Sequence, residues 1–116
     1  MKIFIILLMC LSLCGCSSEN KINQNPNTEL KEILLEDNYI IIDVRTKEEF
    51  DESHLKDALN IPIDEINEEI ELNKSKTILV YCKSGNRSGM AAEALTDLGY
   101  EVYDLGALDN ISLPKE

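Results

Sequence analysis

Basic residues are scarce in this sequence: 11 lysines and arginines stand against 22 aspartates and glutamates, for a net charge of −11. Proteins that bind nucleic acid neutralise phosphates with clustered Lys and Arg, so this balance argues against a DNA or RNA partner. We interpret the acidity as a solvated, soluble surface. With 116 residues, the chain is long enough for one small domain with a modest core.

A disulfide framework is also missing, although the chain contains four cysteines. Cys10, Cys14 and Cys16 lie in or beside an apolar N-terminal run, which leaves Cys82 alone in the rest of the chain. An unpaired thiol on an exposed loop is a liability unless the protein uses it. Cys82 is therefore a candidate functional residue.

No hydrophobic run is long enough to cross a bilayer comfortably. The apolar run of residues 3–13 follows a positive charge and fits the hydrophobic region of a secretory signal. It ends in Leu13-Cys14-Gly15-Cys16, which resembles a bacterial lipobox. This resemblance implies cleavage after Gly15, lipidation at Cys16 and stable anchoring by more than one acyl chain. The alternative is an ordinary signal peptide whose removal releases the protein.

The chain divides into three parts on this interpretation. Residues 1–15 are a lipoprotein signal peptide, residues 16–27 are the lipidated cysteine and a flexible polar tether, and residues 28–116 are a single domain. We expect the domain to lie outside the cytoplasm, held by its lipid anchor to a membrane of the bacterial cell envelope.

Apolar periodicity within the domain predicts helices that alternate with strands. A helix starts at residue 27 or 28 and stops near Asn38, and Thr46 and Glu49 form a capping box that starts a second, short helix. Such alternation is typical of a parallel α/β sheet, in which ligands bind at the carboxyl ends of strands. The expected strands are residues 39–44, 58–62, 77–81 and 101–105; one further helix carries Ile63, Ile66 and Ile70, and another, which stops near Gly99, places Met90, Ala91, Ala94, Leu95 and Leu98 on one face.

Cys82 lies at the carboxyl end of one of these strands, in a tight loop that opens the last helix. Several backbone N–H groups in such a loop can point at one anion, and the helix dipole adds partial positive charge. Both effects favour a thiolate over a thiol, as do the nearby cations Lys83 and Arg87. The sequence therefore predicts an anion cradle with a nucleophile at its floor; the cradle consists of Lys83, Ser84, Gly85, Asn86, Arg87 and Ser88.

Four blocks of sequence carry a family likeness. They are Ile42-Asp43-Val44-Arg45 with Glu48-Glu49-Phe50; His54-Leu55 with Ala58-Leu59-Asn60-Ile61-Pro62; Tyr81-Cys82 with the cradle residues; and Leu98-Gly99-Tyr100-Glu101-Val102-Tyr103-Asp104-Leu105-Gly106. In this order they resemble a single-domain rhodanese across most of residues 28–106. Three departures are Ser53 and Asp57, where relatives often have glycine, and residues 107–111, which lack a second glycine and a tryptophan. Asp57 tolerates the positive φ that its turn would need.

The resemblance implies a rhodanese-like three-layer α/β fold, with a central parallel sheet of about five strands flanked by helices on both faces. It also implies an enzyme of the thiosulfate:cyanide sulfurtransferase class that carries sulfur as a persulfide on Cys82. The partners would be a small anionic sulfur donor and a thiol, cyanide or protein acceptor. The cradle would bind substrate, with Asp43 and Arg45 in support. We expect a monomer without metal or cofactor.

Two charged side chains have alternative roles. Arg87 either binds substrate oxygens or ties the loop to Glu48, Glu49 or Asp43, and we favour the structural role. His54 is the only histidine and hence the only candidate imidazole base. We expect it to be a hydrogen-bonded turn residue instead.

Two other functions remain open. One is a non-catalytic persulfide carrier or redox-binding module, which would accept one sulfur without multiple turnover. The other is a Cys-dependent phosphatase or arsenate reductase on the same scaffold. Phosphatase relatives need a longer loop to surround a tetrahedral oxyanion, whereas Cys82 to Arg87 spans six residues. The short loop favours a single sulfur atom.

Overall fold

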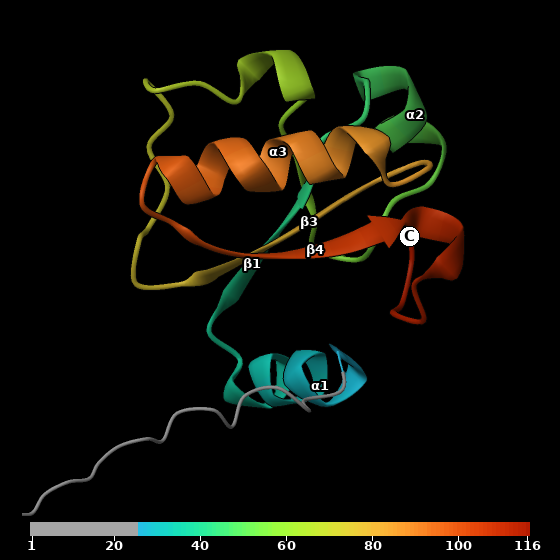
Figure 1. Cartoon of the computed structure of the whole chain (residues 1–116). Helices are drawn as coiled ribbons and strands as arrows, with labels where there is room; N and C mark the ends of the chain where they lie inside the picture. The colour runs from blue at the N-terminus through green and yellow to red at the C-terminus, as the bar shows by residue number, and fades with distance from the viewer. Residues whose placement is uncertain (1–25) are drawn as a thin grey trace, which may run out of the picture.

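The protein was analysed as a computed structural model, which describes residues 26–116 (Figure 1). Four parallel strands form one sheet in the order β2-β1-β3-β4. Helix α1 covers one face of the sheet, and α3 covers the other. The elements are α1 (Pro26–Glu36), β1 (Tyr39–Asp43), α2 (Lys47–Glu52), β2 (Leu59–Asn60), the 3-10 helix η2 (Ile63–Glu65), β3 (Thr77–Cys82), α3 (Asn86–Asp97), β4 (Glu101–Ala107) and the 3-10 helix η3 (Leu108–Asn110).

The predicted alternation of strands and helices is confirmed, and each expected strand is present with shifted ends. Residues 26–116 contain four strands, whereas the family resemblance implied about five. The predicted signal peptide, the lipidation site Cys16 and the tether up to residue 25 lie outside the described residues. No helix within residues 26–116 has the length and apolarity needed to cross a membrane.

The strand β3 is buried on both faces, so it anchors the sheet. Ile78 and Val80 pack with Ala91 and Leu95 of α3, while Leu79 faces the side covered by α1. Successive side chains of a strand point to opposite faces, and each buried aliphatic side chain contributes about 1.5–3 kcal/mol. The last residue of this well-anchored strand is Cys82.

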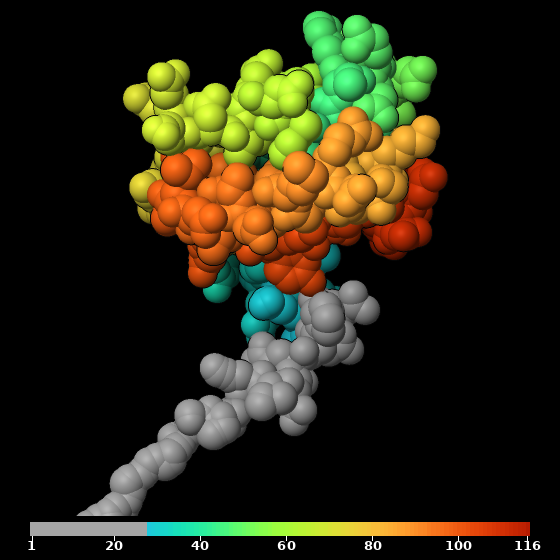
Figure 2. Space-filling view, turned by 45° about the horizontal axis from the view of Figure 1, so that its top comes forward, coloured from blue at the N-terminus to red at the C-terminus, as the bar shows by residue number. Residues whose placement is uncertain are grey.

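One predicted helix is wrong. Only Ile63–Glu65 is helical, as a 3-10 turn, and residues 66–76 form turns and irregular structure beside α3 (Figure 2). Asn67 accepts a hydrogen bond from the backbone N–H of Glu69 at 2.8 Å, which offers the backbone an alternative to the helix. Like charges three and four residues apart also disfavour a helix here. The isoleucines of this segment nevertheless pack against the core.

A second correction concerns Met90, which sequence periodicity placed on the buried face of α3. Its side chain is 61% exposed, while Ala91 and Leu95 are fully buried. Neighbouring positions on a helix differ by about 100°, so Met90 lies beside the apolar stripe that Ala91 begins. The predicted end of this helix near Gly99, which has φ +98°, is confirmed.

Candidate active site

The loop between β3 and α3 curls around the sulfur of Cys82. Gly85 has φ +97° and precedes the first helical residue, Asn86, and its backbone N–H donates a hydrogen bond to Cys82 Sγ at 2.9 Å. A Cβ at Gly85 would meet nothing nearer than Gly106 Cα at 3.9 Å. The left-handed backbone, not the space, is therefore what favours glycine at this position.

Hydrogen bonds favour the ionised form of this thiol. Burial raises the pKa of Cys82, but hydrogen bonds from the Ser88 hydroxyl and from the backbone N–H groups of Ser88, Gly85 and Ser84 outweigh burial and hold the pKa below its usual value. The Sγ atom lies 3.5 Å from Ser88 Oγ, which can also donate to the Gly85 carbonyl at 3.2 Å. The predicted lowering of the thiol pKa agrees with this geometry.

The sequence predicted an exposed loop thiol, and in this respect the prediction is wrong. Cys82 has 0% exposure and belongs to the core between the sheet and α3. Its loop neighbours Lys83, Ser84 and Asn86 are exposed, and Gly85 is half-buried. The sulfur therefore lies directly beneath the loop.

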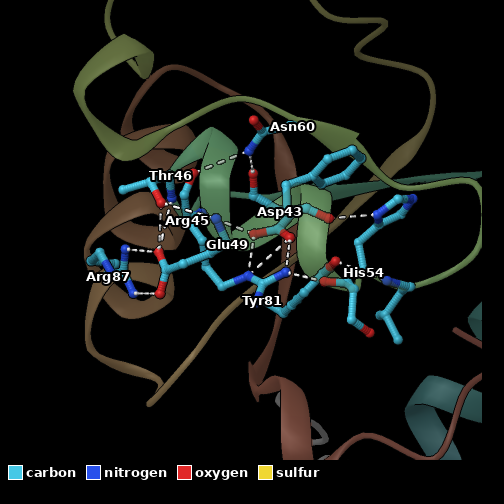
Figure 3. A network of polar contacts seen from close by, with 11 residues as sticks. Asp43, Arg45, Thr46, Glu49, His54, Asn60, Tyr81 and Arg87 are labelled. Atoms are coloured by element: carbon cyan, nitrogen blue, oxygen red, sulfur yellow. Dashed lines mark hydrogen bonds and ion pairs between the residues drawn. The ribbon is translucent and has the colours of Figure 1, made fainter. Parts of the chain in front are cut away.

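Arg87 ties the loop to α2 through Glu49 (Figure 3). The distances are 2.8 Å from Nη1 to Oε1 and 3.2 Å from Nη2 to Oε2. Glu49 also accepts hydrogen bonds from the N–H and hydroxyl of Thr46, which completes the predicted capping box. The Arg87 hydrogen bond is the main cause that lowers the pKa of Glu49 to about 2. Of the three anions considered for Arg87, Glu49 is the one that binds it.

A buried ion pair joins Arg45 to Asp43 at the end of β1 (Figure 3). Arg45 Nη2 lies 2.6 Å from Asp43 Oδ2, and both side chains are almost fully buried. Arg45 also donates to the Ser53 carbonyl at 2.6 Å and stacks over the ring of Tyr81, 5.7 Å from its centroid. Asn60 Nδ2 donates to the backbone carbonyls of Asp43 and Arg45. The geometry is that of a scaffold; a supporting role in catalysis stays a prediction.

Sequence reasoning missed Tyr81 and Asn60. The Tyr81 hydroxyl accepts a hydrogen bond from the backbone N–H of Leu55 at 3.0 Å, and Tyr81 directly precedes Cys82. Both residues act through partners that are distant in the sequence, and their places in the blocks of family likeness are the signal that could have singled them out.

His54 is a turn residue, as predicted. Its Nδ1 lies 2.8 Å from the Phe50 carbonyl oxygen, and its ring stacks on that of Phe50 with centroids 3.7 Å apart. Its backbone N–H and carbonyl both pair with Glu116, next to a bridge between Leu55 and Lys115. Asp57 has φ +67°, which matches the expectation for this turn.

Carboxylates are plentiful, but they do not gather around the thiol. Within residues 26–116, no three His, Cys, Asp or Glu side chains form a group that could hold a metal ion. Near the loop, Asp43 and Glu49 are each bound by an arginine. This arrangement leaves the thiol and the donors around it as the chemical centre of the site.

Both the sequence and the fold of this chain match known proteins. The family model described as a rhodanese-like domain matches residues 26–110. Thiosulfate sulfurtransferase PspE of Escherichia coli is 41% identical over 78 residues, which cover 64% of this chain and 75% of that protein. The putative sulfur carrier protein YrkF of Bacillus subtilis is 37% identical over 62 residues, which cover 53% of this chain and 34% of that protein. A solved structure titled rhodanese with anions from E. coli has 39% identity and a TM-score of 0.63 over 67% of this chain and 96% of that chain. The predicted rhodanese-like fold is confirmed, and the chain belongs to the rhodanese-like family.

Proposed function

We propose that this protein is a sulfurtransferase that carries sulfane sulfur as a persulfide on Cys82. The observation that supports the proposal best is the set of N–H and O–H donors around one sulfur atom, led by Gly85 N–H at 2.9 Å. Such preorganised donors stabilise a thiolate before the reaction and a persulfide anion after it. The sulfurtransferase and sulfur-carrier names of two relatives support the same chemistry.

The proposed reaction has two steps. The Cys82 thiolate attacks the outer sulfur of thiosulfate or of a persulfide donor, and a new S–S bond forms. The donor's own S–S bond breaks, and sulfite or a thiolate leaves with the bonding electrons. A thiol or cyanide acceptor, or a protein thiol, then attacks the outer sulfur of the Cys82 persulfide and regenerates the thiolate. In the cradle, backbone N–H groups of Ser84, Gly85 and Ser88 face the charge in both steps.

A persulfide carrier without turnover is the second candidate, because YrkF is named a putative sulfur carrier. Intact mass separates loading from turnover: after incubation with thiosulfate or cysteine persulfide, the protein gains one sulfur that dithiothreitol removes. A sulfurtransferase then releases many equivalents of sulfite or thiol per protein when a small thiol acceptor is present. A carrier stops at one equivalent. A protein that gains no sulfur from either donor has neither function.

We also propose, from the sequence alone, that Cys16 is the lipidated N-terminus of the mature protein and that the domain works as a monomer outside the cytoplasm. Protein extracted from cell-envelope membranes would then begin with an acylated Cys16 peptide. An N-terminus at another residue, without acyl chains, would contradict this proposal.

Removing the Ser88 hydroxyl should raise the pKa of Cys82. In Ser88→Ala, the thiolate loses a hydrogen bond that lowers the pKa, so we expect the pKa of Cys82 to rise. The thiolate exists above its pKa, so this change moves the titration curve to higher pH and leaves less thiolate at neutral pH. Ultraviolet absorbance of the thiolate against pH measures the shift, with the same variant lacking Cys82 as the blank. An unchanged curve would exclude Ser88 as a thiolate donor.

A further inference from the structure

Two cations stand in the segment that encloses the thiol, Lys83 in the loop and Arg87 in the first turn of α3, but only Lys83 is free of an ion pair. Lys83 is exposed and forms no ion pair within residues 26–116. Arg87 is bound through both of its terminal nitrogens to both carboxylate oxygens of Glu49. A bidentate pair of this kind fixes the guanidinium in place and cancels most of its charge at a distance. The positive charge that the site offers to a substrate is therefore smaller than its sequence suggests.

Glu49 is held so that it cannot easily leave Arg87. Its backbone N–H bonds to the Thr46 hydroxyl at 3.2 Å, and its Oε1 atom accepts from the N–H and hydroxyl of Thr46. Its pKa of about 2 keeps it ionised at every pH at which the protein would work. Both Glu49 and Arg87 are mostly buried, at 26% and 31% side-chain exposure, so solvent screens the pair only in part.

The charge of Arg87 matters for the nucleophile. The pKa of Arg87 is raised chiefly by its hydrogen bond to Glu49, against the effect of burial, with a smaller contribution from the charge of Cys82. Arg87 directly precedes Ser88, whose Oγ lies 3.5 Å from Cys82 Sγ, so the charge of the guanidinium acts on charge that develops at the sulfur. Glu49 weakens the effect of Arg87 on the sulfur, because its carboxylate is paired with the Arg87 guanidinium.

The two classes of donor differ in the charge that this site must accommodate. Thiosulfate is a dianion and releases sulfite, another dianion, when the thiolate takes its outer sulfur. The persulfide of a thiol without other net charge releases a single thiolate: Cys82–S⁻ and R–S–SH give Cys82–S–SH and R–S⁻. The transferred sulfur keeps its oxidation state in both reactions, so neither needs an oxidant or a reductant.

We propose that Glu49 is a positioning residue that directs this site towards alkyl persulfide donors of low charge and away from doubly charged donors such as thiosulfate. It acts by holding and neutralising Arg87. The inference rests on the proposed function, because it names the donor for the Cys82 persulfide.

The test compares two donors in the full chain. Cysteine persulfide and thiosulfate are supplied separately with the same thiol acceptor, and kcat/KM is measured for each. In Glu49→Gln, the capping box can still form, because glutamine is also accepted at that position, but the charge on Arg87 is uncovered. We expect the thiosulfate-to-persulfide ratio of kcat/KM to rise about tenfold, the effect of one partly screened charge at close range.

Two further variants distinguish the charge on Arg87 from the overall charge of the protein and from the order of the loop. Glu48→Gln removes the same charge from an exposed neighbouring residue, and we expect its ratio to stay within about twofold of the unmodified protein because solvent screens it. The double variant Glu49→Gln/Arg87→Gln removes the uncovered cation as well, so its ratio should fall back towards that of the unmodified protein. A loose loop would lower kcat/KM for both donors by the same factor, so the thiosulfate-to-persulfide ratio would not change.

The proposal is overturned if Glu49→Gln leaves the ratio unchanged, if Glu48→Gln raises it equally, or if the double variant keeps the raised ratio. These results are distinct from failure of the proposed function. If the proposed function fails, neither the unmodified protein nor any variant loads sulfur on Cys82 from either donor.

Discussion

Cys82→Ser is expected to abolish sulfur loading and turnover while the domain stays folded. A serine hydroxyl does not ionise near neutral pH, so it lacks the anion that the surrounding donors stabilise. Serine is close to cysteine in size, and its hydroxyl can accept the Gly85 N–H that now bonds to the sulfur. The side chain is fully buried, but the polar donors around it keep the new hydroxyl satisfied. We expect circular dichroism to remain that of the unmodified protein.

Intact mass after incubation with either sulfur donor measures this effect. The unmodified protein should gain one sulfur that dithiothreitol removes, and Cys82→Ser should gain none. The matched control replaces the N-terminal cysteines Cys10, Cys14 and Cys16 with serine and keeps Cys82, and it should load normally in the purified protein. Residual loading in Cys82→Ser would remove Cys82 from its proposed role.

Asp43→Ala is expected to lower the free energy of unfolding by about 3–5 kcal/mol, the usual cost of removing one partner from a buried ion pair. Asp43 is fully buried, and Arg45 is 5% exposed. Without the carboxylate, the guanidinium keeps the Ser53 carbonyl as a partner but loses its counter-charge. Asp43 also ends the strand that leads into α2, and Glu49 of α2 binds Arg87 beside the site. We therefore expect the rate of sulfur transfer to fall together with stability.

Urea unfolding followed by circular dichroism measures the change. The control is Asp51→Ala, which breaks an ion pair with Lys47 at the surface. The Lys47 side chain is 75% exposed, and the Asp51 side chain is 58% exposed. An exposed pair of this kind contributes about 0–1 kcal/mol. Equal losses in the two variants would show that the buried pair does not hold this part of the fold.

Local patterns explain which parts of the structure were predictable from sequence. The strand that ends at Cys82 is a short apolar run, and the helix after it has a clear apolar stripe that ends near a glycine. The capping box of Thr46 and Glu49 needs only residues three apart. A turn histidine and an aspartate at positive φ are equally local features. Each of these depends on neighbours within a few positions.

Other features depended on residues that meet only in the folded chain. The segment after Ile63 has helical spacing, but Asn67 and packing beside α3 hold it in turns. Met90 fits an apolar stripe by spacing, yet the sheet meets α3 along Ala91 and Leu95 instead. The burial of Cys82 follows from its place between the sheet and α3, which no single stretch of sequence reveals.

From sequence alone came an α/β domain of the rhodanese type, a cysteine at the end of a strand and a short loop of donors around it. The α/β alternation and the loop follow because periodicity and loop length are written in consecutive residues, whereas the rhodanese type follows from the resemblance of four blocks of sequence to that family. The tertiary structure decided that Arg87 pairs with Glu49, that the sulfur lies beneath the loop, and that Tyr81 and Asn60 brace the site. Ion pairs and burial depend on which distant side chains the sheet brings together, and that choice is made only when the whole core packs.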